Sequence, residues 1–319
     1  MTVPKDHTVS TLAARPSAFL DSEATRERAL TRLAAHVEAG HVTGGSLLWE
    51  GERGSVAGCL IDSADPAEWE TRLGLARWMA FALDTVAGRL SPKAALSETQ
   101  ALLSAVPLGA NTVQLGSTVM ARLLEDIAAV RAPDGALAAV LSNLLALHRR
   151  AEADDAIAPS TWRALRHAAV AATDALGPAP VDGERLPLEI AQRRGVGLAI
   201  EAAAWDPRRS PTAVSELLRQ WLALESLKSD EAFGWTDQDD ALIRKTLAEM
   251  HARYIEDRPE EKRTVFDFLE LHHADMATRL RAYIKHGSDH GAVCAARACA
   301  LLRQILQLPS PQPDTRIAA

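Results

Sequence analysis

The chain has 319 residues, 47% of them hydrophobic, and a formal net charge of −7 from 35 basic and 42 acidic side chains. Alanine (60 residues) and leucine (42 residues) make up about a third of the chain, whereas Phe (5) and Tyr (2) are scarce. Because Ala and Leu favour helices while β-branched and aromatic residues favour strands, this composition excludes an all-β fold and argues against a parallel α/β sheet.

Helix caps, glycines and prolines divide the chain into about eleven predicted helices, which indicates an all-α, multi-helical array or bundle. The first helix is predicted between Asp21 and Gly40. Residues 43–61 then interrupt the helical pattern, because five of these residues are Gly. A short β-hairpin or an ordered loop is expected there. The later helices are predicted over residues 67–73, 75–87, 97–106, 112–130, 136–151, 161–176, 188–205, 212–228, 237–257 and 260–286, and from Ser288 to about Leu308.

The segment 177–187 is the best linker candidate, because it holds two Gly and three Pro residues. It divides the chain into an N-terminal helical region, residues 1–177, and a C-terminal helical region, residues 178–319. Both regions are rich in amphipathic helices with short connections. One continuous domain is therefore the alternative to two.

Charge and cysteine content bear on partners and compartment. The acidic balance lacks the basic field typical of nucleic-acid binding, which argues against nucleic acid as a partner. Three cysteines are too few, and odd in number, for a disulfide framework. The N-terminus lacks the apolar core of a signal peptide, and no stretch approaches the ~18 apolar residues of a membrane span. We therefore expect a cytoplasmic protein with no membrane contact.

Phosphate-binding and common catalytic motifs are missing from the sequence. The pair Gly195 and Gly197 forms only a G-x-G within a helical pattern, without the strand that a dinucleotide-binding turn requires. Close helix packing explains these two glycines better than a cofactor does. No cofactor is predicted on this ground.

The densest group of potential metal ligands lies near the C-terminus. A turn at Gly287 would bring together His286, Asp289 and His290, with Cys294 one helical turn further on. Imidazole and thiolate suit zinc or another divalent metal. The structural alternative is that His286 stabilises a helix C-terminus, that Asp289 caps the next helix and that Cys294 is a small core residue.

A second group of candidates surrounds the Gly-rich segment. Trp49 and Cys59 lie within it, and Trp78 lies on the following apolar helix. Since binding residues often sit on loops held by a rigid scaffold, these three residues could line a small-ligand pocket. The structural alternative is that Trp49 anchors the loop and that Trp78 belongs to the core.

Residues 43–111 resemble part of a known family. The chain contains, in order, the steps Gly58-Cys59-Leu60-Ile61, Leu73-Gly74-Leu75 and Ala105-Val106-Pro107-Leu108-Gly109-Ala110. These steps resemble the Gly-rich W…GC, LGI and AIPVGA steps of a family of uncharacterised bacterial proteins. The chain departs from the family at its first Cys, where Ser55 or Val56 stands, and at its His, where Asp62 stands. The resemblance implies a helical region downstream and no known activity.

Three functions remain open at this point. The first expectation is a non-enzymatic helical protein that acts through protein contact or self-association, because amphipathic helices are abundant and motifs are few. The second is a metal-binding protein or metal-dependent enzyme that uses His286, Asp289 and His290. The third is a small-ligand binder near Trp49, Cys59 and Trp78.

Overall fold

A computed structural model describes residues 17–177, 186–258 and 260–308, and within these ranges the chain is mainly helical. The N-terminal elements are a short 3-10 helix η1 (Ala18–Asp21), α1 (Glu23–Glu38), β1 (Trp49–Glu50), β2 (Arg53–Gly54), α2 (Val56–Ile61), α3 (Pro66–Leu73), α4 (Arg77–Ala87) and α5 (Pro92–Ala105). They are followed by α6 (Leu115–Val130), α7 (Gly135–Glu152), α8 (Pro159–Asp174), α9 (Leu188–Ala202), α10 (Ala213–Phe233), α11 (Asp237–Tyr254), α12 (Val265–His272) and α13 (Ala274–Leu306). The all-α fold expected from the composition is thus confirmed.

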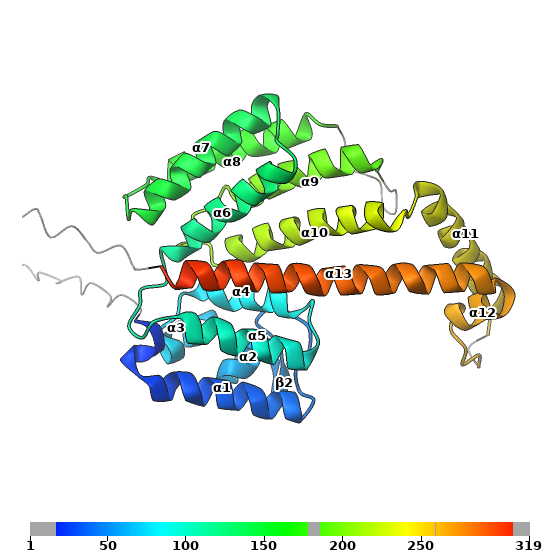
Figure 1. The fold of residues 1–319 in the computed structure, drawn as a ribbon, viewed down its shortest axis with the longest axis horizontal. Helices are drawn as coiled ribbons and strands as arrows, with labels where there is room; N and C mark the ends of the chain where they lie inside the picture. Colours follow the sequence, from blue (N-terminus) through cyan, green and yellow to red (C-terminus); the bar gives the residue numbers. More distant parts are fainter. Residues whose placement is uncertain (1–16, 178–185, 259, 309–319) are drawn as a thin grey trace, which may run out of the picture.

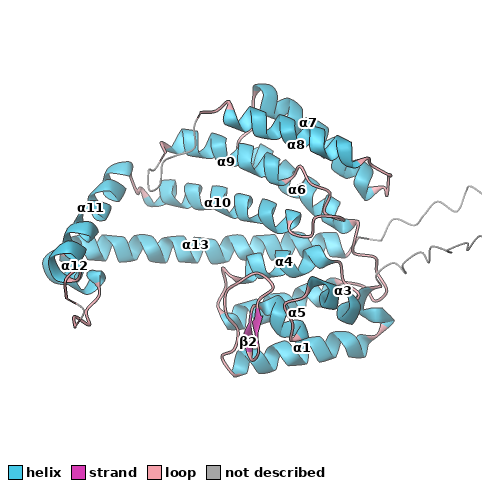
Figure 2. Cartoon of the chain, turned by 180° about the vertical axis from the view of Figure 1, so that it is seen from behind, coloured by secondary structure: helices cyan, strands magenta, loops and turns pink. Residues whose placement is uncertain are grey.

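The long helix α13 organises the molecule. It crosses the whole width of the fold, with α1–α5 on one side and α6–α10 on the other (Figure 1). Its C-terminal half packs against α4, α5, α6 and α10, while its first turns pack against α12. The helices α11 and α12 lie at the far end of α13, away from the other helices (Figures 1 and 2). We call Trp235, α11, α12 and residues 274–289 of α13 the arm, and the remaining helices the body.

Two hydrophobic clusters correspond to this division. The body cluster contains residues from Ala18 to Leu306 and includes fully buried Trp69, Leu123 and Leu144. The arm cluster contains only five buried residues, namely Trp235, Ile243, Leu269, Ala277 and Leu280. The expected domain boundary between residues 177 and 178 lies at the start of residues 178–185, which are outside the described residues. The body cluster contains residues from both sides of this boundary.

Two expectations for the C-terminal helices are wrong. The predicted helix 260–286 is broken at His273, whose φ and ψ of −142° and 58° are not helical, and this break separates α12 from α13. The predicted turn at Gly287 does not exist, because α13 runs through it. A glycine inside a helix costs only about 1 kcal/mol relative to alanine, and the packing of α13 at both ends offsets this cost.

The Gly-rich segment contains the expected hairpin, in a very short form. Trp49 pairs with Gly54 and Glu50 with Arg53 in an antiparallel pair of two-residue strands, the only strands in the described part of the chain (Figure 2). The second apolar run of the segment is not a strand but the helix α2. The hydroxyl of Ser55 caps this helix by accepting a hydrogen bond from the Gly58 amide at 3.2 Å.

Close backbone contacts explain the glycines that carry the family resemblance. A Cβ atom on Gly58 would lie 2.0 Å from the Leu48 carbonyl oxygen, and one on Gly74 would lie 1.8 Å from that of Ser17. Gly74 also ends α3 with a positive φ of 63°. Both glycines are therefore required by the packing of the body. Similarly, Gly195 faces Leu224 and Gly197 faces Thr173 at contact distances, which confirms close helix packing at the G-x-G pair.

Among the described residues, no helix combines the length and the apolar character that crossing a bilayer requires.

Candidate metal centre

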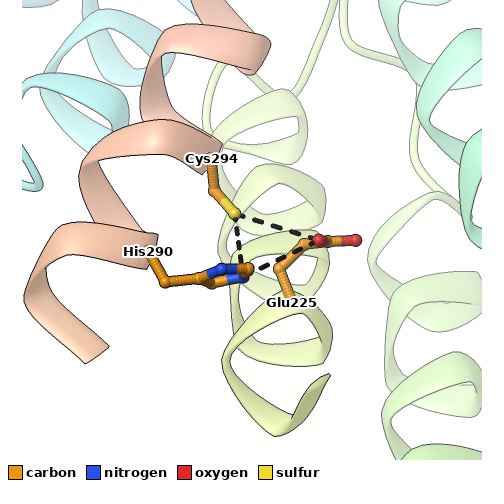
Figure 3. Close-up of side chains that lie close together, drawn as sticks. All are labelled: Glu225, His290 and Cys294. Atoms are coloured by element: carbon orange, nitrogen blue, oxygen red, sulfur yellow. Dashed lines mark hydrogen bonds and ion pairs between the residues drawn. The ribbon is translucent and has the colours of Figure 1, made fainter. Parts of the chain in front are cut away.

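One group of potential metal ligands lies where α10 and α13 cross. The carboxylate of Glu225 on α10 faces the imidazole of His290 and the thiol of Cys294 on α13 (Figure 3). One ligand atom from each residue lies within 4.8 Å of the other two. Elsewhere in the described residues, no three His, Cys, Asp or Glu side chains form such a group.

The distances within this group are short, and two of its three side chains are buried. The Cys294 Sγ atom is 3.3 Å from His290 Nε2 and 3.8 Å from Glu225 Oε2, and the last two atoms are 4.0 Å apart. Cys294 and Glu225 are buried, with 1% and 4% of their surface exposed, whereas His290 is partly exposed. A buried carboxylate needs a compensating cation, since removing a charge from water is costly.

Two cations from the protein provide this compensation. Lys228 Nζ lies 2.5 Å from Glu225 Oε1, and Arg297 Nη1 donates to Glu225 Oε2 at 3.2 Å. Arg297 also donates to Asp126 at 3.4 Å and lies over the ring of Trp221. Both cations are partly solvent-exposed, so their contacts with Glu225 can be exchanged for water.

The state of the thiol follows from these surroundings. Burial raises the pKa of Cys294 above its ordinary value, and the nearby Glu225 carboxylate raises it further. The thiol is therefore protonated at neutral pH in the absence of a metal, and it is a poor nucleophile. The same His290 nitrogen faces both Cys294 and Glu225, whereas in a catalytic triad the acid holds the other ring nitrogen. The arrangement fits ligation of a metal better than nucleophilic catalysis.

The sequence-predicted ligands are only partly brought together. His290 and Cys294 lie one turn apart on α13, as expected. His286 lies one turn earlier, where the facing residue of α10 is Phe233, and the two rings are 5.4 Å apart. The Asp289 carboxylate is exposed and accepts a hydrogen bond from Lys285 at 2.6 Å. The structure thus gathers His290 with Cys294 and Glu225 instead of with His286 and Asp289.

Glu225 is not among the candidates that the sequence motifs single out. The spacing of apolar residues along α10 indicates that Glu225 is buried. Glu225 follows Trp221 by four residues and Leu222 by three, so it lies on the buried stripe of the helix. A lone carboxylate at a core position indicates a buried partner, although it does not say which helix provides that partner.

The three candidates around the Gly-rich segment each make structural contacts. Trp49 packs edge-on against His36, with ring centroids 5.1 Å apart. Trp78 is in the core and donates to the Thr112 carbonyl oxygen at 3.0 Å. Cys59 is fully buried, and burial raises the pKa of its thiol to about 11, with a further contribution from Asp84. Each of the three therefore makes a separate structural contact.

The Gly-rich segment is instead held by a buried carboxylate. Asp84 on α4 accepts hydrogen bonds from the backbone amides of Leu47 at 2.6 Å and Ala57 at 2.8 Å. Burial raises the pKa of Asp84 to about 6, although these two hydrogen bonds favour its charged form. A cavity of about 240 Å³ adjoins this carboxylate and residues 42–45. Both oxygens of Asp84 are engaged by the backbone, which explains the residue as an anchor of the loop.

Comparison of the chain with known protein families, with curated proteins and with solved structures found no match in any of the three. The family resemblance of residues 43–111 therefore stays a prediction.

Proposed function

We propose that this protein binds a divalent metal ion of the zinc type through Glu225, His290 and Cys294. The observation that carries the proposal is the convergence of three different ligand atoms from two packed helices within 4.8 Å. Thiolate and imidazole are the preferred ligands of zinc, and Asp or Glu carboxylates also ligate it. Metal binding was one of the functions expected from the sequence; the ligand set proposed is new.

The number of ligands favours an exchangeable ion over a purely structural one. Structural zinc is almost always held by four protein side chains, whereas sites with three leave a position for water or another molecule. His290 is partly exposed and provides access to solvent for the ion. We therefore propose a site that takes up and releases its metal, or that uses it to hold a second ligand.

The two cations that contact Glu225 lead to a specific prediction about the affinity of the site for zinc. A divalent ion and the Lys228 ammonium compete for the same carboxylate, and so do the ion and the Arg297 guanidinium. Arg297 has an alternative partner in Asp126, and Lys228 extends to solvent. Replacing Lys228 with Met removes a competing charge and should strengthen zinc binding, by about tenfold if the lost repulsion is ~1.4 kcal/mol.

The test is calorimetric titration of the metal-free protein with zinc at neutral pH. We expect one equivalent to bind, and Glu225→Gln, His290→Ala and Cys294→Ser each to weaken binding at least about tenfold. His286→Ala, Asp289→Asn and Cys299→Ser serve as matched controls, because they change the same residue types outside the group. Circular dichroism verifies that each variant is folded. Zinc binding by Cys294→Ser with the affinity of the wild type would contradict the proposal.

Protein contact or self-association, the first expectation from the sequence, is a separate proposal. It is supported by large apolar side chains that are exposed on the arm and beside it, such as Leu271, Ile284 and Val293. Ile284 and Val293 are nine residues apart on α13, which is about 900° of rotation, and so they lie on opposite faces of the helix. Because these side chains form no single stripe, we rank this proposal second. Sedimentation of wild type and Ile284→Glu tests it, and identical monomers would contradict it.

The proposed metal site also bears on the compartment of the protein. A thiol ligand must stay reduced, and the three cysteines of the chain are free. This supports a reducing compartment such as the cytoplasm.

A further inference from the structure

A cavity of about 270 Å³ lies directly beside the candidate metal centre. It is formed by α6, α9 and α10, and Glu225 is part of its wall. Its apolar wall includes Val196, Trp221 and Leu224. Pockets for drug-sized ligands usually exceed about 300 Å³, so this cavity fits a smaller molecule with an apolar body.

The charges of the cavity are balanced as long as no metal is bound. Arg131 and Lys228 provide two positive charges, and Glu225 and Glu231 provide two negative charges. The Lys228 ammonium is held by Glu225 at 2.5 Å. Arg131 contacts Gln192 at 3.0 Å and the well-exposed Glu189 at 3.1 Å. An exposed pair of this kind contributes little and is readily exchanged.

A metal ion on Glu225 changes this balance. The ion takes up the carboxylate charge, so Lys228 loses its partner while remaining in the wall of the cavity. The wall of the cavity then carries two positive charges, on Arg131 and Lys228, and only one negative charge, on Glu231. The divalent ion lies next to it. An ion with three protein ligands also keeps one position for an outside ligand. The loaded cavity is therefore positive and partly apolar.

We infer that the metal-loaded protein binds a small organic anion in this cavity, such as a carboxylate with a compact apolar tail. The anionic group lies toward Lys228 and Arg131, and the tail packs on Trp221 and Leu224. Charge-assisted hydrogen bonds from Arg and Lys are the usual means of holding a carboxylate. The inference rests on the proposed metal function and specifies its ligand class.

The test uses benzoate as the probe, titrated by calorimetry into the protein with and without one equivalent of zinc. We expect benzoate to bind at least about tenfold more tightly to the zinc-loaded protein, because the metal turns a charge-balanced cavity into a positive one. Benzyl alcohol, which has the same ring and no charge, should show no dependence on zinc. Free zinc titrated with benzoate provides the blank.

Two variants separate this inference from the metal site itself. Lys228→Met should bind zinc more tightly and benzoate more weakly, a pair of opposite effects that a merely structural change would not produce. Arg131→Gln should weaken benzoate and leave zinc unchanged, while Lys245→Met on α11 leaves both unchanged. Equal benzoate affinity with and without zinc, in protein that binds one equivalent of zinc, would overturn the inference and leave the metal function standing. Protein that binds no zinc would overturn both.

Discussion

The body and the arm of this protein are stabilised in different ways, although α13 belongs to both. The body buries the C-terminal half of α13, including Cys294, Cys299 and Leu302, within one large cluster. The arm buries only Ala277 and Leu280 of the same helix. One helix therefore passes from a region held by extensive apolar burial to a region with a small core, and the candidate metal centre lies at the transition.

The arm replaces missing burial with local interactions. Thr236 and Asp239 form a capping box at the start of α11, and Thr264 and Asp267 form another at the start of α12. Aromatic rings stack at 4.1 Å between Trp235 and Tyr283. Such local interactions contribute about 0.5–2 kcal/mol each. Because its apolar core is small, the arm should open independently of the body.

The largest effect is expected at a body glycine. Gly74→Ala would place a Cβ atom 1.8 Å from the Ser17 carbonyl oxygen at a residue with a φ of 63°, so the backbone must shift. We expect a loss of about 4 kcal/mol in the free energy of unfolding. Gly234→Ala is the matched control at the entrance to the arm. Its φ is 73° but no atom lies within 4 Å, and about 1 kcal/mol is expected. Urea denaturation measures both; equal losses would contradict the steric explanation.

Cavity-forming substitutions should separate the two regions. Leu269→Ala in the arm removes a side chain that is 1% exposed and should cost about 3 kcal/mol. Because the arm cluster is small, we expect hydrogen exchange to accelerate between residues 237 and 285 only. Leu123→Ala in the body should instead accelerate exchange throughout. A uniform change in Leu269→Ala would show that arm and body unfold as one unit.

Two buried titratable groups of the body should give opposite pH dependences. Burial lowers the pKa of His148 to about 4, although its Nε2 donates to the Ala203 carbonyl oxygen at 2.8 Å. The unfolded state, with a His pKa near 6.5, then binds more protons, so this group makes stability rise with pH between 4 and 6. Asp84, with its pKa raised to about 6, binds more protons in the folded state and makes stability fall over the same window.

Each contribution amounts to about 2 kcal/mol between pH 4 and 6, and in the wild type the two nearly cancel. The free energy of unfolding of Asp84→Asn should therefore rise between pH 4 and 6, because only the contribution of His148 remains. That of His148→Gln should fall over the same range, because only the contribution of Asp84 remains. Urea midpoints at pH 4, 5 and 6 provide the measurement. Slopes of the same sign in both variants would refute this assignment. In the described part of the arm, Arg279 and Thr236 lower the pKa of Asp239 to about 2, so the contribution of this group to the pH dependence lies below pH 4.

The smallest effect is expected from an ion pair of the arm. Arg279 donates to the Asp239 carboxylate at 2.8 Å and to the Gly234 carbonyl oxygen at 3.2 Å, and about half of its side chain is exposed. Arg279→Gln should cost less than about 1 kcal/mol, since water screens exposed pairs. The loss should shrink further in 1 M salt. A salt-independent loss would instead indicate that the stem of Arg279 packs on Trp235.

Much of the fold could be predicted from local sequence signals. Composition and caps predicted the all-α class, and the Gly-rich interruption predicted a hairpin or an ordered loop within residues 43–61, where the structure has the short hairpin between Trp49 and Gly54. The helical continuity through Gly287 could not be predicted, because a glycine there weakens the helix locally while packing at both ends of α13 retains it. The break at His273 likewise depends on how α12 packs in the arm.

The candidate metal centre could be predicted from the sequence only in part. His290 and Cys294 are four residues apart on one helix, so sequence alone places them on one face, and this is a property of the helical period. His286 shares that face, yet it meets Phe233 instead of a ligand. Only the crossing of α10 and α13 decides that Glu225 faces Cys294 and that Lys228 and Arg297 compete for it. Local hydrogen bonds and propensities determine which residues share a helix face, whereas the packing of distant helices determines what that face meets.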